Sequence, residues 1–232
     1  MTEAVIQVSS LGKSIKGKII LEDISFEINQ GDCVALIGPN GAGKSTLMSC
    51  ILGDKKHSSG QVLIEGKAGK AKNQIAVLLQ ENTIPNSLKV SELIAFFQTI
   101  SDNSLTNQEV QELLQFKEDQ YQQFADKLSG GQRRLLAFVL CLIDKPKILF
   151  LDEPTAGMDT STRQRFWEIV NDLKKAGTTI LYSSHYIEEV EHTADRILVL
   201  HQGKLIRDTT PYAMRHEEKE KQVTLPSSFV SI

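Results

Sequence analysis

The stretch CVALIGPNGAGKST, residues 33–46, decides the fold of this chain. Its first five residues, 33–37, are a continuous apolar run that predicts a buried strand. Residues 38–45 then follow the pattern G-x-x-x-x-G-K-[ST], and residues 44–52 have the composition of a helix. A strand, a glycine-rich turn and a helix in this order predict a phosphate site, because backbone N–H groups and the positive end of the helix dipole point at the same place.

The residues of this turn are expected to hold phosphate oxygens together. Glycines allow the backbone N–H groups to turn inward, Lys44 supplies a point charge for the β- and γ-phosphates, and the Ser45 hydroxyl is the expected protein ligand of Mg²⁺. A chance glycine-rich turn is the alternative, and the flanking strand and helix argue against it. The candidate nucleotide-binding residues of this phosphate loop are Gly38, Pro39, Asn40, Gly41, Ala42, Gly43, Lys44, Ser45 and Thr46.

A second apolar run, residues 148–151, ends in two acidic residues, Asp152 and Glu153. A buried strand would deliver both carboxylates to its C-terminal end, and ligands of open α/β sheets bind at that edge. Asp152 is the expected Mg²⁺ ligand, acting through water. Glu153 is the expected general base that polarises the attacking water. The alternative for such a pair alone is that it caps the helix that follows.

Between these two segments lies LSGGQ, residues 128–132, at the start of a strongly apolar helical run. Serine is a favoured helix N-cap, and the glycines after it leave the N–H groups of the first helical turn accessible. The segment is therefore a second candidate anion site in the same chain, formed by a helix N-terminus. An ordinary capped helix is the alternative for any Ser-Gly-Gly sequence.

The three segments in this order resemble the ATP-binding cassette (ABC) ATPases, and the resemblance covers nearly the whole chain. It implies an α/β fold of the P-loop NTPase type: a RecA-like core with a mostly parallel sheet, an N-terminal antiparallel β-subdomain and an inserted α-helical subdomain. We expect one ABC ATP-binding domain over residues 1–232, with the helical insert at 81–143. Alternating strands and helices along the chain, and helical apolar spacing over residues 90–143, agree with this architecture.

The resemblance also implies roles for further positions. Gln80 matches the glutamine that touches Mg²⁺ or the attacking water, and His185 matches the histidine that contacts the γ-phosphate. Two chains would form a head-to-tail sandwich around ATP, in which the LSGGQ segment of each chain faces the γ-phosphate held by the other. The residues expected at that interface are Ser129, Gly130, Gly131, Gln132 and Asp159.

One position departs from the family pattern. Many members carry an aromatic residue upstream of the phosphate loop that stacks on adenine, whereas no aromatic residue occurs between Met1 and Ser25 of this chain. Alignment with the usual pattern places Ile15 at that position. We therefore expect weaker stacking, or apolar packing of Ile15 on the base, with ATP as the default nucleotide and its selection over GTP left open.

The composition is that of an ordinary globular protein and argues against several functions. Of 232 residues, 41% are hydrophobic and 24% charged, and the net charge of −3 gives no general attraction to nucleic acid or anionic lipid. The longest apolar run, residues 135–143, is about half as long as a bilayer-spanning helix. We expect no secretory signal, and we expect three reduced, buried thiols at Cys33, Cys50 and Cys141.

These features together predict an ATP-binding and ATP-hydrolysing subunit of an ABC transporter. Its expected partners are a separate membrane permease and, in a nucleotide-dependent dimer, itself or a related ATPase subunit. It would then lie at the cytoplasmic face of the cell membrane. Segments 157–159 (GMD) and 131–134 (GQRR) resemble bacterial drug and antibiotic exporters, which favours export. The aromatic residues of the insert that could line a groove for the permease are Phe96, Phe97, Phe116, Tyr121 and Phe124.

Two other classes of function use the same ATP chemistry. A soluble ABC ATPase that acts as an assembly or regulatory scaffold is the main alternative, and it differs in what the helical insert docks against. A nucleic-acid-associated ATPase would carry a basic stripe and long arms, and neither is apparent in the sequence. We therefore expect no nucleic-acid partner.

Overall fold

The computed structural model describes residues 4–67, 75–80, 84–85 and 87–221 of the chain. The chain forms two compact units: residues 1–72 together with 179–232 make up unit 1, and residues 73–178 make up unit 2. Both units contain strands and helices, so the predicted α/β class is confirmed. Within the described ranges, no helix combines the length and the apolar composition that a membrane span requires.

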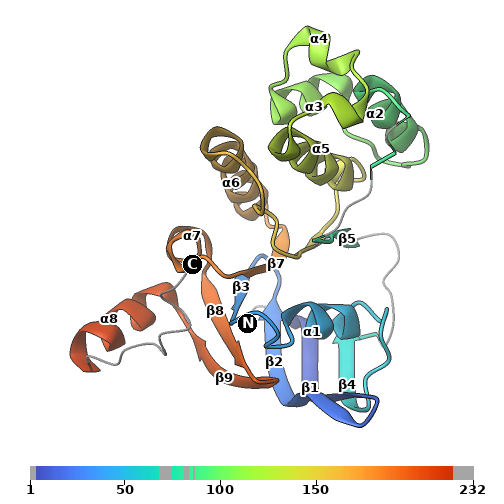
Figure 1. Cartoon of the computed structure of the whole chain (residues 1–232). Helices are drawn as coiled ribbons and strands as arrows, with labels where there is room; N and C mark the ends of the chain where they lie inside the picture. The colour runs from blue at the N-terminus through green and yellow to red at the C-terminus, as the bar shows by residue number, and fades with distance from the viewer. Residues whose placement is uncertain (1–3, 68–74, 81–83, 86, 222–232) are drawn as a thin grey trace. The chain divides into compact units, whose positions relative to one another are not determined.

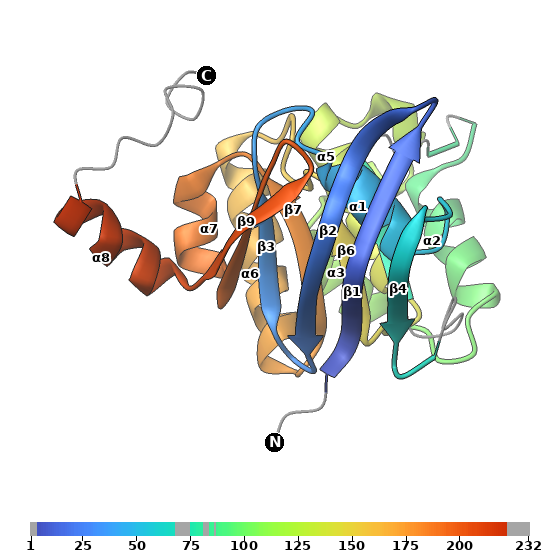
Figure 2. The ribbon, with the colours of Figure 1, turned by 90° about the horizontal axis from the view of Figure 1, so that it is seen from below.

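An antiparallel sheet opens unit 1, as the sequence predicts for the N-terminal subdomain. Strands β1 (Ala4–Ile15), β2 (Lys18–Asn29) and β4 (Ser59–Ile64) lie in the order β2-β1-β4. The β1–β2 hairpin turns through Lys16 and Gly17, both of which have positive φ, the conformation that a tight two-residue hairpin needs. Figure 2 shows the three strands side by side with helix α1 behind them.

A second sheet of unit 1 carries the phosphate loop. Strand β3 (Cys33–Ile37) is buried along its whole length and pairs in parallel with β7 (Thr179–Ser184) and with β8 (Arg196–His201). Strand β9 (Lys204–Thr209) joins β8 antiparallel at the edge. Parallel strands buried on both faces read as continuous apolar runs, which is why residues 33–37 show no alternation. The helices of unit 1 are α1 (Lys44–Ile51), α7 (Ile187–Thr193) and α8 (Pro211–Lys221).

Unit 2 combines two parallel strands with a cluster of helices. Strands β5 (Ile75–Leu78) and β6 (Ile148–Leu151) pair in parallel, and the sequence predicts β6 correctly. Figure 1 shows α2, α3, α4 and α5 gathered together with α6 beside α5. The helical elements are α2 (Val90–Thr99), α3 (Asn107–Leu114), α4 (Glu118–Tyr121), the 3₁₀ turn Ala125–Lys127, α5 (Gly130–Leu142) and α6 (Thr160–Lys175).

Helix α5 is the centre of unit 2 because it is apolar over most of its surface. It contacts α2, α3, α6 and β5. The ring of Phe138 on α5 packs at a tilt against the ring of Phe166 on α6 with 4.4 Å between ring centroids, and both side chains are fully buried. Arg134 is an exception on this buried helix, since its side chain is charged yet only 9% exposed.

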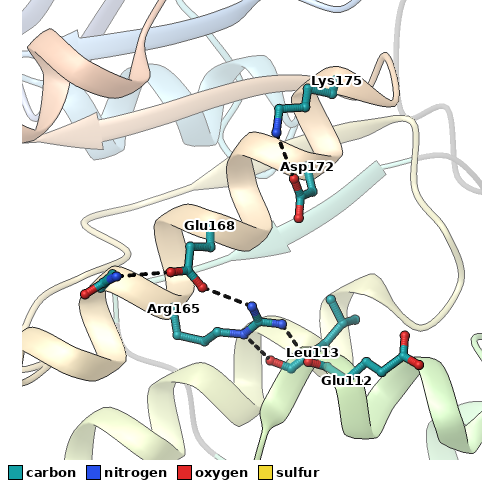
Figure 3. Close-up of polar contacts among 7 residues, drawn as sticks. Glu112, Leu113, Arg165, Glu168, Asp172 and Lys175 are labelled. Atoms are coloured by element: carbon teal, nitrogen blue, oxygen red, sulfur yellow. Dashed lines mark hydrogen bonds and ion pairs between the residues drawn. The ribbon is translucent and has the colours of Figure 1, made fainter.

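The C-terminal end of α3 is fastened to α6 by one arginine. Arg165 Nε donates to the Leu113 carbonyl at 3.0 Å, and Nη2 donates to the Glu112 carbonyl at 2.6 Å (Figure 3). A third bond, from Nη1 to the Glu168 carboxylate at 3.0 Å, orients the guanidinium. The last carbonyls of a helix have no partners within the helix, so Arg165 supplies the donors that α3 lacks at this end.

We predict that Arg165→Met lowers the free energy of unfolding by about 1–3 kcal/mol, because two carbonyls lose charged donors. Urea denaturation followed by circular dichroism measures this change. The matched control is Lys175→Met, which removes the exposed ion pair with Asp172 on the same helix (Figure 3). That change should cost less than about 0.5 kcal/mol. Equal losses in the two variants would contradict the fastening role of Arg165.

Candidate nucleotide site

The phosphate loop lies between β3 and α1, as predicted. The N–H groups of residues 44–46 have no acceptor four residues earlier within the helix, and the first bond into it runs from the Leu47 N–H to the Gly43 carbonyl at 2.8 Å. The Lys44 side chain is buried, and its Nζ donates to the Gly38 carbonyl at 2.8 Å and to the Pro39 carbonyl at 3.4 Å. The ammonium group is thereby held across the loop, close to the N-terminus of α1.

Close packing against the backbone requires a glycine at position 38, and position 43 is also crowded. A Cβ at Gly38 would lie 2.1 Å from the Leu200 carbonyl oxygen, and a Cβ at Gly43 would lie 2.8 Å from Leu21 Cδ2. The loop is tied to the β8–β9 turn as well, because the Gly203 N–H donates to the Ala42 carbonyl at 3.0 Å. Neighbouring residues of unit 1 therefore help to set the conformation of the loop.

Unit 1 also holds two other predicted residues. Ile15 ends β1 opposite Lys18, and its side chain is 40% exposed, so apolar surface remains available there. His185 follows β7 directly, is exposed, and lies against Tyr186 with 4.1 Å between ring centroids.

Asp152 and Glu153 leave the carboxyl end of β6 in different environments. The Asp152 N–H donates to the Leu78 carbonyl at 2.8 Å and continues the parallel ladder, and its side chain is 6% exposed. Glu153 has a φ of 45°, a left-handed conformation that costs a residue with a side chain about 1–3 kcal/mol. Its Oε2 accepts a hydrogen bond from Gln80 Nε2 at 3.2 Å. The structure thus brings together two of the three predicted catalytic side chains.

The LSGGQ segment begins α5 with a complete capping box. The Gln132 N–H donates to Ser129 Oγ at 3.2 Å, and the Ser129 N–H donates to Gln132 Oε1 at 3.1 Å. Ser129 and Gly130 are exposed, whereas Gly131 is buried. The cap and the exposure of Ser129 and Gly130 agree with the prediction of an accessible helix N-terminus.

Asp159 lies next to this helix start and has a structural task of its own. A Cβ at Gly131 would lie 3.1 Å from Asp159 Oδ2, so the absence of a side chain lets the starts of α5 and α6 approach closely. Asp159 caps α6 by accepting from the Thr162 N–H at 3.0 Å. This bond and those from the Thr162 and Ser161 hydroxyls hold the pKa of Asp159 far below its usual value. Its negative charge is therefore fixed at the start of α6, where the helix dipole favours it.

Arg134 is the residue that the sequence reasoning missed. From α5 its guanidinium reaches the main chain that follows β5 and the main chain that follows β6. It donates to Asp152 and Gln80 carbonyls at 2.9 Å each and to Pro154 at 3.1 Å. A signal does exist in the sequence: Arg134 stands within the apolar stretch of α5, three residues after Gly131 and four before Phe138, on the face that packs inward.

The predicted site residues divide between the units. Unit 1 carries the phosphate loop, Ile15 and His185, and unit 2 carries Gln80, the LSGGQ segment, the two acidic residues after β6 and Asp159. The three predicted Mg²⁺ ligands offer a hydroxyl, a carboxylate and an amide, all with oxygen donors. Oxygen ligands are those that Mg²⁺ prefers, so the donor set fits this ion. These three residues are Ser45, Asp152 and Gln80.

The thiols are less uniformly buried than predicted. The described cysteines are all free of disulfides, and Cys33 and Cys50 are buried, but Cys141 is intermediate in exposure. Its Sγ contacts the Val77 carbonyl at 3.5 Å, and burial of the sulfur raises the pKa of Cys141 to about 11. The thiol is therefore protonated near neutral pH.

Known proteins resemble this chain over most of its length. Residues 21–156 match the family described as ABC transporter. The Nod factor export ATP-binding protein I of Rhizobium johnstonii is 34% identical over 94% of this chain and 73% of that protein. The linearmycin resistance ATP-binding protein of Bacillus subtilis is 34% identical over 87% of this chain and 68% of that protein. A solved ATP-binding subunit of an ABC transporter superposes with a TM-score of 0.82 at 26% identity, covering 97% of this chain and 98% of that chain.

We predict that Gly38→Ala lowers nucleotide affinity about tenfold or more and stability by about 1–3 kcal/mol, because the new methyl group must displace the loop or β8. Titration with a fluorescent ATP analogue and urea denaturation measure the two effects. The control is Gly53→Ala, where φ is also positive but a Cβ would meet no described heavy atom within 4 Å. It should cost about 1 kcal/mol of backbone strain and leave affinity unchanged. Unchanged affinity in Gly38→Ala would contradict the prediction.

Proposed function

This chain belongs to the ABC transporter family, and from that premise we propose that it powers export through a membrane permease formed by a separate chain. Family membership establishes that it is an ATP-binding subunit with ATPase activity. Export is supported by the names of two relatives, a Nod factor export protein and a linearmycin resistance protein. The contact of Gln80 with Glu153 is the observation that carries our assignment of the reacting groups.

Nucleotide binding would start at the phosphate loop. Its backbone N–H groups and those of the first turn of α1 donate to phosphate oxygens. Lys44 Nζ would exchange the neutral Gly38 carbonyl for a charged phosphate, which is a stronger acceptor. The exposed alkyl surface of Ile15 supports apolar packing on the base, without the ring stacking that an aromatic residue would give.

Hydrolysis would use the side chains that end β6 and follow β5. Glu153 accepts the proton of the attacking water, and Gln80 orients that carboxylate through its Nε2. His185 is the proposed contact to the γ-phosphate. Ser45, Gln80 and, through water, Asp152 would hold Mg²⁺, and the ion would neutralise charge on the phosphates.

The capped start of α5 supports a nucleotide-dependent dimer. Ser129 and Gly130 are exposed, and the Ser129 hydroxyl is fixed by the capping box at a helix N-terminus, where an anion is favoured. We infer that these residues, with Gly131 and Gln132, complete the ATP site of a second chain. Asp159, beside them at the start of α6, would lie at the same interface, and the second chain is another copy or a related ATPase subunit.

The insert aromatics have different degrees of exposure, which narrows the candidates for permease docking. Phe96 and Phe124 are 55% and 45% exposed. Phe97 and Phe116 are intermediate, and Tyr121 belongs to the core of the helical cluster. Exposed apolar side chains on unit 2 suit an apolar partner segment, and the names of the export and resistance relatives favour a permease as the protein that supplies it. On this proposal the chain sits at the cytoplasmic face of the membrane.

We predict that Glu153→Gln keeps ATP binding within about twofold of the wild type and lowers kcat about a hundredfold or more, because an amide cannot accept the proton. Equilibrium binding and phosphate release measure the two quantities. ATP-bound dimers should accumulate in this variant and be visible by light scattering. Near-normal turnover would show that Glu153 is not the base.

Two controls separate the steps of this experiment. Lys44→Ala should lose ATP binding, because the ammonium group that faces the phosphates is gone. Ser129→Arg in the Glu153→Gln background should still bind ATP but form no dimer, because the new side chain occupies the exposed start of α5. ATP-induced dimers that survive Ser129→Arg would contradict the proposed interface.

We expect this chain, purified from native membranes in mild detergent, to carry a stoichiometric polytopic membrane protein. Mass spectrometry identifies the partner. Phe96→Glu combined with Phe124→Glu should reduce its recovery, since charged groups would replace the exposed apolar ones. Tyr212→Glu is the control, because Tyr212 is 71% exposed but lies on α8 of unit 1. Recovery with soluble proteins only would support the scaffold alternative instead.

A further inference from the structure

Arg134 uses every N–H donor of its guanidinium on main-chain carbonyls. Nε donates to the Pro154 carbonyl at 3.1 Å, and Nη2 donates to Asp152 at 2.9 Å and Glu153 at 3.3 Å. Nη1 donates to the Gln80 carbonyl at 2.9 Å and to the Leu79 carbonyl. An arginine offers five N–H donors in one plane, and here all five have acceptors.

The acceptors belong to two short segments that lie next to each other in unit 2. One segment leaves β5 and contains Gln80, and the other leaves β6 and contains Glu153. Their carbonyls lie beyond the paired strands β5 and β6, where the ladder no longer supplies donors. One planar cation therefore supplies the donors at both chain exits and fixes the distance between them.

Burial makes this arrangement specific to arginine. The side chain is 9% exposed, and a buried charge is tolerated only when it is fully hydrogen-bonded. Burial lowers the pKa of Arg134 while the nearby Asp152 carboxylate opposes that shift, and arginine remains protonated at any working pH. A lysine could place a point charge there, but it lacks the fork that reaches both segments at once.

The backbone at Glu153 needs such support. Its φ of 45° is unfavourable for a residue with a side chain, so the surrounding structure must hold it. Arg134 binds the carbonyls of Asp152, Glu153 and Pro154, which brackets the strained residue on both sides. The same guanidinium binds the carbonyl of Gln80, whose side chain meets the Glu153 carboxylate at 3.2 Å.

We propose that Arg134 is a positioning residue for ATP hydrolysis, which holds the main chain of Gln80 and Glu153 so that their side chains meet in the productive geometry. The proposal rests on the roles proposed above for those two side chains. Arg134 itself touches no reacting atom in this scheme. Its effect passes through the placement of the Glu153 carboxylate, where a shift of about 1 Å can cost about a hundredfold in rate.

The test compares Arg134→Met, Arg134→Gln and Arg134→Lys in the full chain. We expect Arg134→Met to lower kcat about ten- to a hundredfold with the Kd for ATP within about twofold, since the phosphate loop belongs to unit 1. Lysine and glutamine should rescue part of the rate, because each keeps some donors. The matched control is Arg133→Met on the same helix, whose Nη2 donates to the Ile84 carbonyl at 3.2 Å. It should keep wild-type kcat.

A double-variant cycle separates positioning from a general loss of stability. If Arg134 acts through Glu153, then Arg134→Met should lower the single-turnover rate of Glu153→Gln, measured with γ-labelled ATP, by less than about twofold. An equal fold-loss in the wild-type and Glu153→Gln backgrounds would overturn the proposal, as would wild-type kcat in Arg134→Met. If Arg134→Met does not fold, as judged by circular dichroism, the same rates are measured for Arg134→Gln and Arg134→Lys in the wild-type and Glu153→Gln backgrounds.

The same data keep this proposal distinct from the proposed function. Near-normal turnover of Glu153→Gln alone would reject the base assignment. If Glu153→Gln lowers kcat as predicted but the Arg134 variants keep wild-type kcat, only the positioning role is rejected.

Discussion

Backbone carbonyls that leave a buried parallel strand need donors, and this constraint shapes both units. In unit 1 the donor is the Lys44 ammonium group, which binds the carbonyls of Gly38 and Pro39 where the chain leaves β3. In unit 2 it is the Arg134 guanidinium, which binds the carbonyls that follow β5 and β6. The two cations differ in role: we propose that the lysine exchanges its carbonyl acceptors for a phosphate, whereas all five N–H donors of the arginine are already used on carbonyls.

Local patterns in the sequence predict the parts of the site that are built from neighbouring residues. The phosphate loop follows from a strand, glycines and a helix within residues 33–46, and the cap of α5 follows from Ser129 and Gln132 alone. The buried strand that ends in Asp152 and Glu153 is equally local, because four apolar residues precede two acids.

The remaining features depend on residues that are distant in sequence. The role of Arg134 could not be predicted, because its acceptors come from two chain segments on different strands. The left-handed backbone at Glu153 could not be predicted either, because the sequence around it has the pattern of a strand end. The exposure of a side chain in the helical cluster is set by packing between helices. Phe96 and Tyr121 are both aromatic residues of the insert, yet Phe96 is exposed and Tyr121 is buried.

Helix α5 has a further consequence when the dimer proposal and the Arg134 proposal are taken together. Ser129 at its start is exposed and, on the dimer proposal, would face a nucleotide bound to another chain, whereas its second turn places Arg134 against the backbone of its own chain's Glu153. The same helix would then contribute to two ATP sites, one on its own chain and one on the other chain. A small rotation of α5 would change the geometry of both sites together, so hydrolysis of the two ATP molecules would be coupled in time.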